Sequence, residues 1–128
     1  MMYIDVIICS KRMISSLSEM NNEEIFDYSL TLQFIAKRIE IYNSATAVTI
    51  SLNEGEVAGQ TIPHFHVHVI PRVKGDLKSN DDVYLKIARF DSEFVKEFTD
   101  LLNNEKNKML IKEQVEKFGN FIQKTYIC

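Results

Sequence analysis

All three histidines of this chain fall within five residues, at His64, His66 and His68. In a β-strand alternate side chains point to the same face, and residues two apart are separated by about 6.5 Å. We therefore expect the three imidazoles to line one face of a strand. The residues that alternate with them are apolar and should face the core: Phe65, Val67 and Val69.

Imidazole titrates near neutral pH and can serve as nucleophile, acid or base. Three histidines in a row could also bind a transition metal, but zinc usually needs three or four convergent ligands. Side chains that rise in parallel from one strand converge only with help, and an Asp or Glu would have to complete such a site. The spacing therefore favours catalysis by imidazole and leaves a metal site as an alternative.

A donor-rich loop precedes the histidines. Gly55 and Gly59 allow backbone conformations closed to other residues. Asn53, Gln60 and Thr61 supply two amides and a hydroxyl beside the histidine strand. Neutral donors of this kind can hold phosphate oxygens without a metal.

The surrounding pattern predicts an α+β fold with a small antiparallel sheet. Apolar and alternating runs predict strands at 3–9, 48–52 and 61–72. Residues 11–22 form a loop or a short helical turn. A long amphipathic helix at 22–42 precedes the histidine strand, with Asn21 and Glu24 as its capping pair. Three further helices are expected near 82–90, 92–103 and 108–126.

The stretch GQTIPHFHVHVIPR, residues 59–72, resembles the signature of the histidine-triad (HIT) family. Residues 73–84 are similar to the fragile-histidine-triad branch of dinucleoside polyphosphate hydrolases. The resemblance implies that His66 attacks the α-phosphorus and forms a nucleotidyl-histidine intermediate, which water hydrolyses. It also implies that the main-chain carbonyl of His64 orients the ring of His66, and that His68 assists the leaving oxygen.

The same resemblance implies that Gln60, Thr61 and Asn53 steady the phosphate oxygens. It implies no metal or cofactor bound by the protein, although magnesium can accompany a polyphosphate substrate. Family members usually carry an opening hairpin and a Gly-His pair, which would fall at Ile4 and Asp5 here. We therefore expect one HIT-like domain over residues 1–128 without that hairpin, with a helical C-terminal extension over about 82–128. An exposed sheet edge then favours a homodimer.

Composition sets the remaining expectations. The net charge is −3 and no basic stripe is present, so nucleic acid is not an expected partner and a small nucleotide is. No apolar run approaches the roughly 20 residues that span a bilayer, and no signal peptide is visible. Cys9 and Cys128 are expected to be free thiols, which fits a cytoplasmic protein.

Three alternatives to the dinucleoside polyphosphate hydrolase stay open. One is a purine nucleoside phosphoramidase, because Asn53-Glu54-Gly55 resembles that branch too. Another is a catalytically weak nucleotide-binding or partner-binding module with an incomplete pocket. The last is a metal-binding domain that uses His64, His66 and His68.

Overall fold

The computed structural model describes residues 4–102 and 125–127. These residues form four strands, two long helices and two short 3-10 turns. In chain order they are β1 (Val6–Ser10), η1 (Leu17–Glu19), α1 (Asn22–Asn43), β2 (Ala47–Ser51), η2 (Glu56–Ala58), β3 (His66–Arg72), α2 (Asp82–Leu102) and β4 (Thr125–Ile127).

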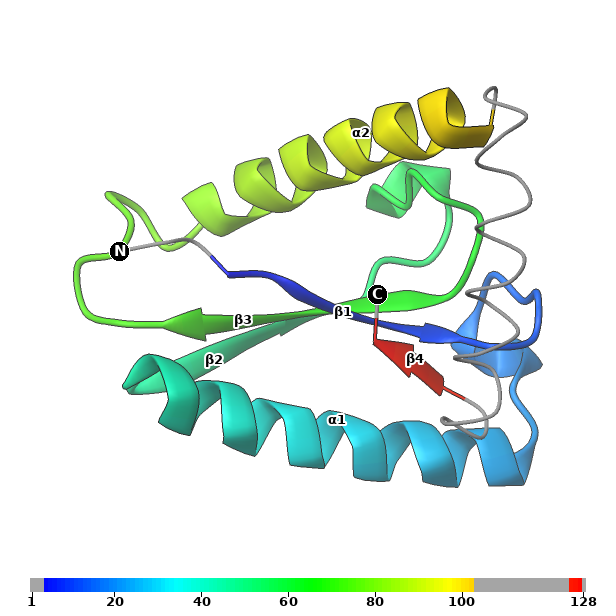
Figure 1. Cartoon of the computed structure of the whole chain (residues 1–128), viewed down its shortest axis with the longest axis horizontal. Coiled ribbons are helices and arrows are strands. Elements are labelled where there is room, and N and C mark those ends of the chain that lie inside the picture. Colours follow the sequence, from blue (N-terminus) through cyan, green and yellow to red (C-terminus); the bar gives the residue numbers. More distant parts are fainter. Residues whose placement is uncertain (1–3, 103–124, 128) are drawn as a thin grey trace.

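The strands make one antiparallel sheet in the order β2-β3-β1-β4, with α1 on one face and α2 on the other (Figure 1). The histidine strand β3 is central, because β1 and β2 both pair with it. Ile7 of β1 and Ser51 of β2 lie opposite His68. The predicted α+β fold with an antiparallel sheet is confirmed.

Helix α1 begins where its capping pair predicts. The Asn21 side chain accepts from the Glu24 N–H, and the Glu24 carboxylate accepts from the Asn21 N–H, so the helix starts at Asn22. The helix packs against the face of the sheet opposite to His66 and His68, where the alternating apolar side chains of this segment point. Phe65, Val67 and Val69 are fully buried there, which confirms their predicted side of the strand.

Helix α2 covers the opposite face, which is the face of the histidines. Ile70 of β3 packs against Val83 and Ile87 of α2 in a second buried cluster. The sequence predicts two helices with a break near residues 90–92, and this prediction is wrong. Neither Gly nor Pro interrupts that segment, so one helix continues through it to Leu102.

The expectations for the last part of the chain are corrected at residues 125–127. A helix was expected there, but Thr125–Ile127 forms strand β4 and pairs with β1, with Ile127 opposite Ile8. The outer edge of β1 is therefore covered, and the exposed edge that favoured a homodimer is not found at this strand. The rest of the helix expected near 108–126 lies outside the described residues.

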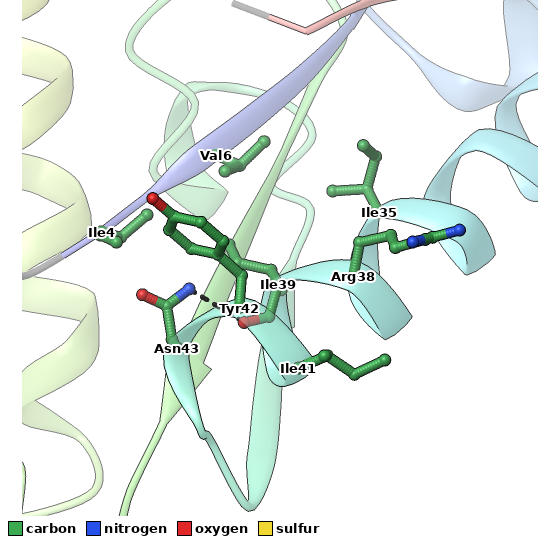
Figure 2. A pocket seen from close by; sticks show the side chains of 8 residues that line it. All are labelled: Ile4, Val6, Ile35, Arg38, Ile39, Ile41, Tyr42 and Asn43. Atoms are coloured by element: carbon green, nitrogen blue, oxygen red, sulfur yellow. Dashed lines mark hydrogen bonds between the residues drawn. The ribbon is translucent and has the colours of Figure 1, made fainter.

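An apolar hollow of about 480 Å³ lies on the α1 side of the sheet (Figure 2). Val6 at the start of β1 and Ile4 just before it line the hollow on one side, and Ile39 and Tyr42 line it from the end of α1. Val6 lies opposite Val69 and shares its face, so the hollow is on the far side of the sheet from His66 and His68. It is therefore separate from the histidine cluster.

The prediction of free cysteines is corrected at one of its two positions. Cys9 is disulfide-bonded, so the predicted free thiol is wrong at this position, while Cys128 lies outside the described residues. Over residues 4–102, neither helix combines the length and the apolar character needed to cross a bilayer.

Candidate active site

The site is organised around a hydrogen bond within the histidine segment. The carbonyl of His64 accepts from Nδ1 of His66 at 2.7 Å. A carbonyl can only accept, so Nδ1 carries the proton and Nε2 of the neutral ring keeps its lone pair. The backbone thus fixes one tautomer of His66.

His64 itself does not join the row of imidazoles that its spacing predicts. Strand β3 starts at His66, and the preceding Pro63 has no N–H to continue a ladder. The His64 ring turns toward β1, where its Nε2 lies 2.6 Å from the Ser10 carbonyl oxygen and 3.1 Å from Ser10 Oγ. Two imidazoles, not three, therefore share the face under α2.

The ring of His68 is held by the carboxylate of Asp5, the residue directly before β1. Its Nδ1 lies 2.9 Å from Oδ2 of Asp5, and both side chains are almost fully buried. The carboxylate fixes the orientation of this ring in the same way that the His64 carbonyl fixes His66. In the neutral ring Nε2 of His68 therefore also keeps a lone pair that faces away from β1.

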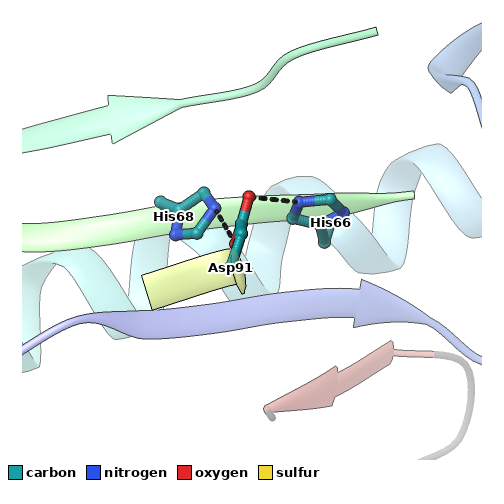
Figure 3. Close-up of side chains that lie close together, drawn as sticks. All are labelled: His66, His68 and Asp91. Carbon is teal, nitrogen blue, oxygen red and sulfur yellow. Dashed lines mark ion pairs between the residues drawn. The ribbon is translucent and has the colours of Figure 1, made fainter. Parts of the chain in front are cut away.

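Asp91 of α2 faces both imidazoles (Figure 3). Its Oδ1 lies 3.3 Å from Nε2 of His68, and its Oδ2 lies 3.8 Å from Nε2 of His66. The hydroxyl of Thr61 donates to the same Oδ2 at 3.0 Å. His66, His68 and Asp91 form a group whose possible metal-ligating atoms all lie within 4.8 Å of one another.

Burial and charge act against each other in this cluster. Burial lowers the pKa of His68, but the hydrogen bond to Asp5 and the nearby carboxylates of Asp5 and Asp91 outweigh burial and raise that pKa to about 9. Burial raises the pKa of Asp91, but its contacts with His66 and His68 and the Thr61 hydroxyl outweigh burial and hold it well below its usual range. His68 and Asp91 are therefore an ion pair at neutral pH.

The cluster is more enclosed than the sequence predicts. The nucleophilic role that the family resemblance implies requires an accessible His66 ring, but the His66 residue is only 7% exposed. Helix α2 is the cause, because its Asp91 covers the two Nε2 atoms (Figure 3).

The donor loop before the histidines is only partly aimed at this cluster. Thr61 reaches it through Asp91, as described above. The Gln60 amide instead joins two loops, since its Nε2 donates to the Ser15 carbonyl before η1 and its Oε1 accepts from the Gly55 N–H of its own loop. Asn53 lies against Gly59, whose φ of +90° is a conformation that glycine favours. The structure therefore brings Thr61 to the imidazoles, whereas Gln60 is engaged with Ser15 and Gly55 and the Asn53 amide lies beside Gly59.

Sequence reasoning missed Asp5 and Asp91, although each left a signal. Asp91 follows Val83 and Ile87 at four-residue intervals and so interrupts the buried stripe of α2 with an acid. Asp5 is the single charged residue in the apolar run 3–9. It lies two residues before Ile7, which is opposite His68, so Asp5 is on the same face as His68. A carboxylate on an apolar face is expensive to bury alone, so each indicated a buried cationic partner.

Comparisons with known proteins identify relatives of this chain. The chain is 34% identical over 79 residues to the bifunctional bis(5'-adenosyl)-triphosphatase/adenylylsulfatase FHIT of Arabidopsis thaliana. The aligned region covers 62% of this chain and 44% of that protein. It is also 34% identical over 84 residues to the bis(5'-adenosyl)-triphosphatase of Dictyostelium discoideum, and this match covers 66% of this chain and 56% of that protein. The crystal structure of Plasmodium falciparum diadenosine triphosphate hydrolase superposes with a TM-score of 0.55 at 25% identity, over 73% of this chain and 63% of that one.

The chain spans about half the length of these two curated relatives. The HIT domain family matches residues 3–75, which include β1, α1, β2 and the histidine strand but not Asp91. From this match over more than half of its length, the chain belongs to the HIT domain family.

Proposed function

We propose that this protein is a nucleotidyl hydrolase that cleaves dinucleoside polyphosphates, such as diadenosine triphosphate, at the α-phosphate. One observation carries the proposal, namely the 2.7 Å hydrogen bond from His66 Nδ1 to the His64 carbonyl. That bond leaves the Nε2 lone pair on the α2 side, next to His68 and Thr61. The relatives named as bis(5'-adenosyl)-triphosphatases supply the substrate class.

The reaction would proceed in two displacements. Nε2 of His66 attacks the α-phosphorus, the bond to the bridging oxygen breaks, and His68 gives its proton to the departing ADP oxygen. Water then attacks the phosphorus of the nucleotidyl-histidine, which releases AMP and returns a proton to His68. Asp5 keeps His68 oriented through both steps and favours its protonated form before the first one.

The Thr61 hydroxyl is the donor best placed to hold a phosphate oxygen, because it already binds an anionic oxygen beside both imidazoles. A phosphate role for Gln60 and Asn53 stays a prediction, and it requires the Gln60 amide to leave Ser15 and Gly55. Magnesium would arrive with the polyphosphate as part of the substrate. The homodimer and the cytoplasmic location also stay predictions.

Incubation of the full chain with diadenosine triphosphate tests the proposal. We expect equal amounts of AMP and ADP, and transfer of labelled AMP to the protein during turnover. Faster release of AMP from an adenosine phosphoramidate would favour the phosphoramidase. Binding of AMP without turnover of either substrate would contradict hydrolysis and favour a nucleotide-binding module.

The Asp91 carboxylate occupies the position that the proposed mechanism gives to a phosphate oxygen. It contacts Thr61, His66 and His68 at once, so an incoming phosphate must displace it. Asp91→Asn removes the competing charge while keeping the side chain's size. We therefore expect the KM for diadenosine triphosphate to fall about tenfold, which corresponds to about 1.4 kcal/mol.

Steady-state kinetics at several substrate concentrations would measure this change. Glu93→Gln is the matched control, because it removes a carboxylate from the same helix where the side chain is exposed and pairs with Arg89. The KM of that variant should stay within about twofold of the wild-type value. A raised KM in Asp91→Asn would contradict competition between the carboxylate and the substrate.

A further inference from the structure

We infer that His66, His68 and Asp91 form a binding site for a divalent transition-metal ion, with zinc as the best match. The ligands would be Nε2 of each imidazole and the carboxylate of Asp91. The spacing of the histidines allows a metal site only if an acidic residue completes it. The structure supplies that residue from α2, and the His64 ring has no place in the site.

The distances between the ligand atoms suit a small ion. Tetrahedral ligands about 2.1 Å from zinc are separated from one another by about 3.4 Å. The Asp91 oxygens lie 3.3 Å from Nε2 of His68 and 3.8 Å from Nε2 of His66. All three ligand atoms lie within 4.8 Å of one another, so small side-chain rotations bring them to coordination distance.

The outer contacts of both imidazoles match those of zinc-binding histidines. A histidine that binds zinc through one ring nitrogen usually donates its other N–H to a carboxylate or a main-chain carbonyl. His68 donates to Asp5 at 2.9 Å, and His66 donates to the His64 carbonyl at 2.7 Å. These bonds direct both Nε2 atoms toward Asp91.

Two buried polar atoms at the centre of the cluster also point to a ligand. Nε2 of His68 and Oδ1 of Asp91 have no hydrogen-bond partner among the described residues, although they form an ion pair 3.3 Å apart. Both residues are only 2% exposed. Buried polar atoms are nearly always partnered, and a shared metal ion would satisfy these two together.

The charge of the cluster favours a cation as long as α2 stays in place. Asp5 and Asp91 bring two carboxylates into the buried space around His68. A divalent ion that replaces the His68 proton would offset both charges, whereas an added phosphate would increase the negative charge. Zinc would also occupy the lone pair of His66 Nε2, so this nitrogen could no longer attack a phosphate. That consequence rests on the proposed function, whereas zinc binding itself does not.

Titration of untagged full-length protein with zinc chloride against a chromophoric chelator, at about pH 8, tests the site. We expect one zinc ion per chain, and cobalt(II) in its place should give the visible absorption of a four-coordinate site. Asp5→Asn should lower the zinc affinity about 10- to 100-fold by removing an outer contact. Asp91→Asn removes a ligand and should lower it further.

Glu93→Gln is the control and should bind zinc as the wild type does, because this exposed side chain lies on the same helix outside the cluster. Circular dichroism of each variant checks that the fold is kept. Equal zinc affinity in the wild type and Asp91→Asn, or a cobalt spectrum of octahedral type, would overturn the inference. Zinc binding by a protein that fails to cleave any dinucleotide would leave the inference standing and refute only the proposed hydrolysis.

Discussion

His66→Asn should lower kcat for diadenosine triphosphate by on the order of 10⁴-fold or more, the largest effect on activity that we expect. The nitrogen lone pair of the asparagine amide is delocalised into its carbonyl group, so it cannot replace the imidazole nitrogen as nucleophile and the covalent step is lost. The His66 ring is nearly buried, and asparagine is smaller and polar, so the sheet should keep its fold. Rapid-quench assays of AMP release, with melting curves of both proteins, would measure this.

His64→Asn is the informative comparison. The proposed role of His64 belongs to its main-chain carbonyl, which the substitution keeps, while the ring contacts Ser10. Its activity should therefore fall far less than that of His66→Asn. Near-wild-type turnover in His66→Asn would end the claim that this residue is the nucleophile. Equal losses in both variants would show that the ring of His64, rather than its carbonyl, matters.

Phe65→Ala should reduce the free energy of unfolding by about 3–5 kcal/mol, a large share of the 5–15 kcal/mol typical of a domain. Phe65 is 1% exposed and lies edge-on to Tyr28 of α1, with ring centroids 5.2 Å apart. Alanine would leave a cavity between the sheet and that helix. Urea unfolding followed by circular dichroism would measure the loss.

Phe34→Ala is the matched control for this prediction. Phe34 also lies on the α1 side, but it is 58% exposed and contacts the guanidinium of Arg38 at its surface. Its removal should cost less than about 1 kcal/mol. If the two variants lost similar stability, the core assigned between β3 and α1 would be wrong.

The parts of this structure that local sequence patterns determine were predictable. The capping pair Asn21 and Glu24 fixed the start of α1, and strict alternation fixed which face of β3 carries Phe65 and which carries His66. These features depend on residues within four positions of one another. The pattern therefore reports them without knowledge of the tertiary fold.

The parts that depend on distant packing were not predictable. Asp5 and His68 are 63 residues apart, and the cover that Asp91 forms over His66 requires α2 to lie on the histidine face. The predicted break in α2 falls at Asp91, an acid whose buried partners lie on another element and therefore leave no local pattern. The position of His64 was also missed, since the turn at Pro63 ends the alternation before it reaches that residue.

The central place of β3 has a consequence for how the catalytic strand can move. Strands on both sides hydrogen-bond to it, so its backbone cannot open unless the sheet separates. Amide protons of residues 67–69 should therefore exchange with deuterated water only as fast as the whole domain unfolds. The contacts that join α2 to β3 within the described residues are made by side chains, those of Asp91, Val83 and Ile87. Displacement of the helix would therefore let solvent reach the imidazoles while the strand beneath stays intact.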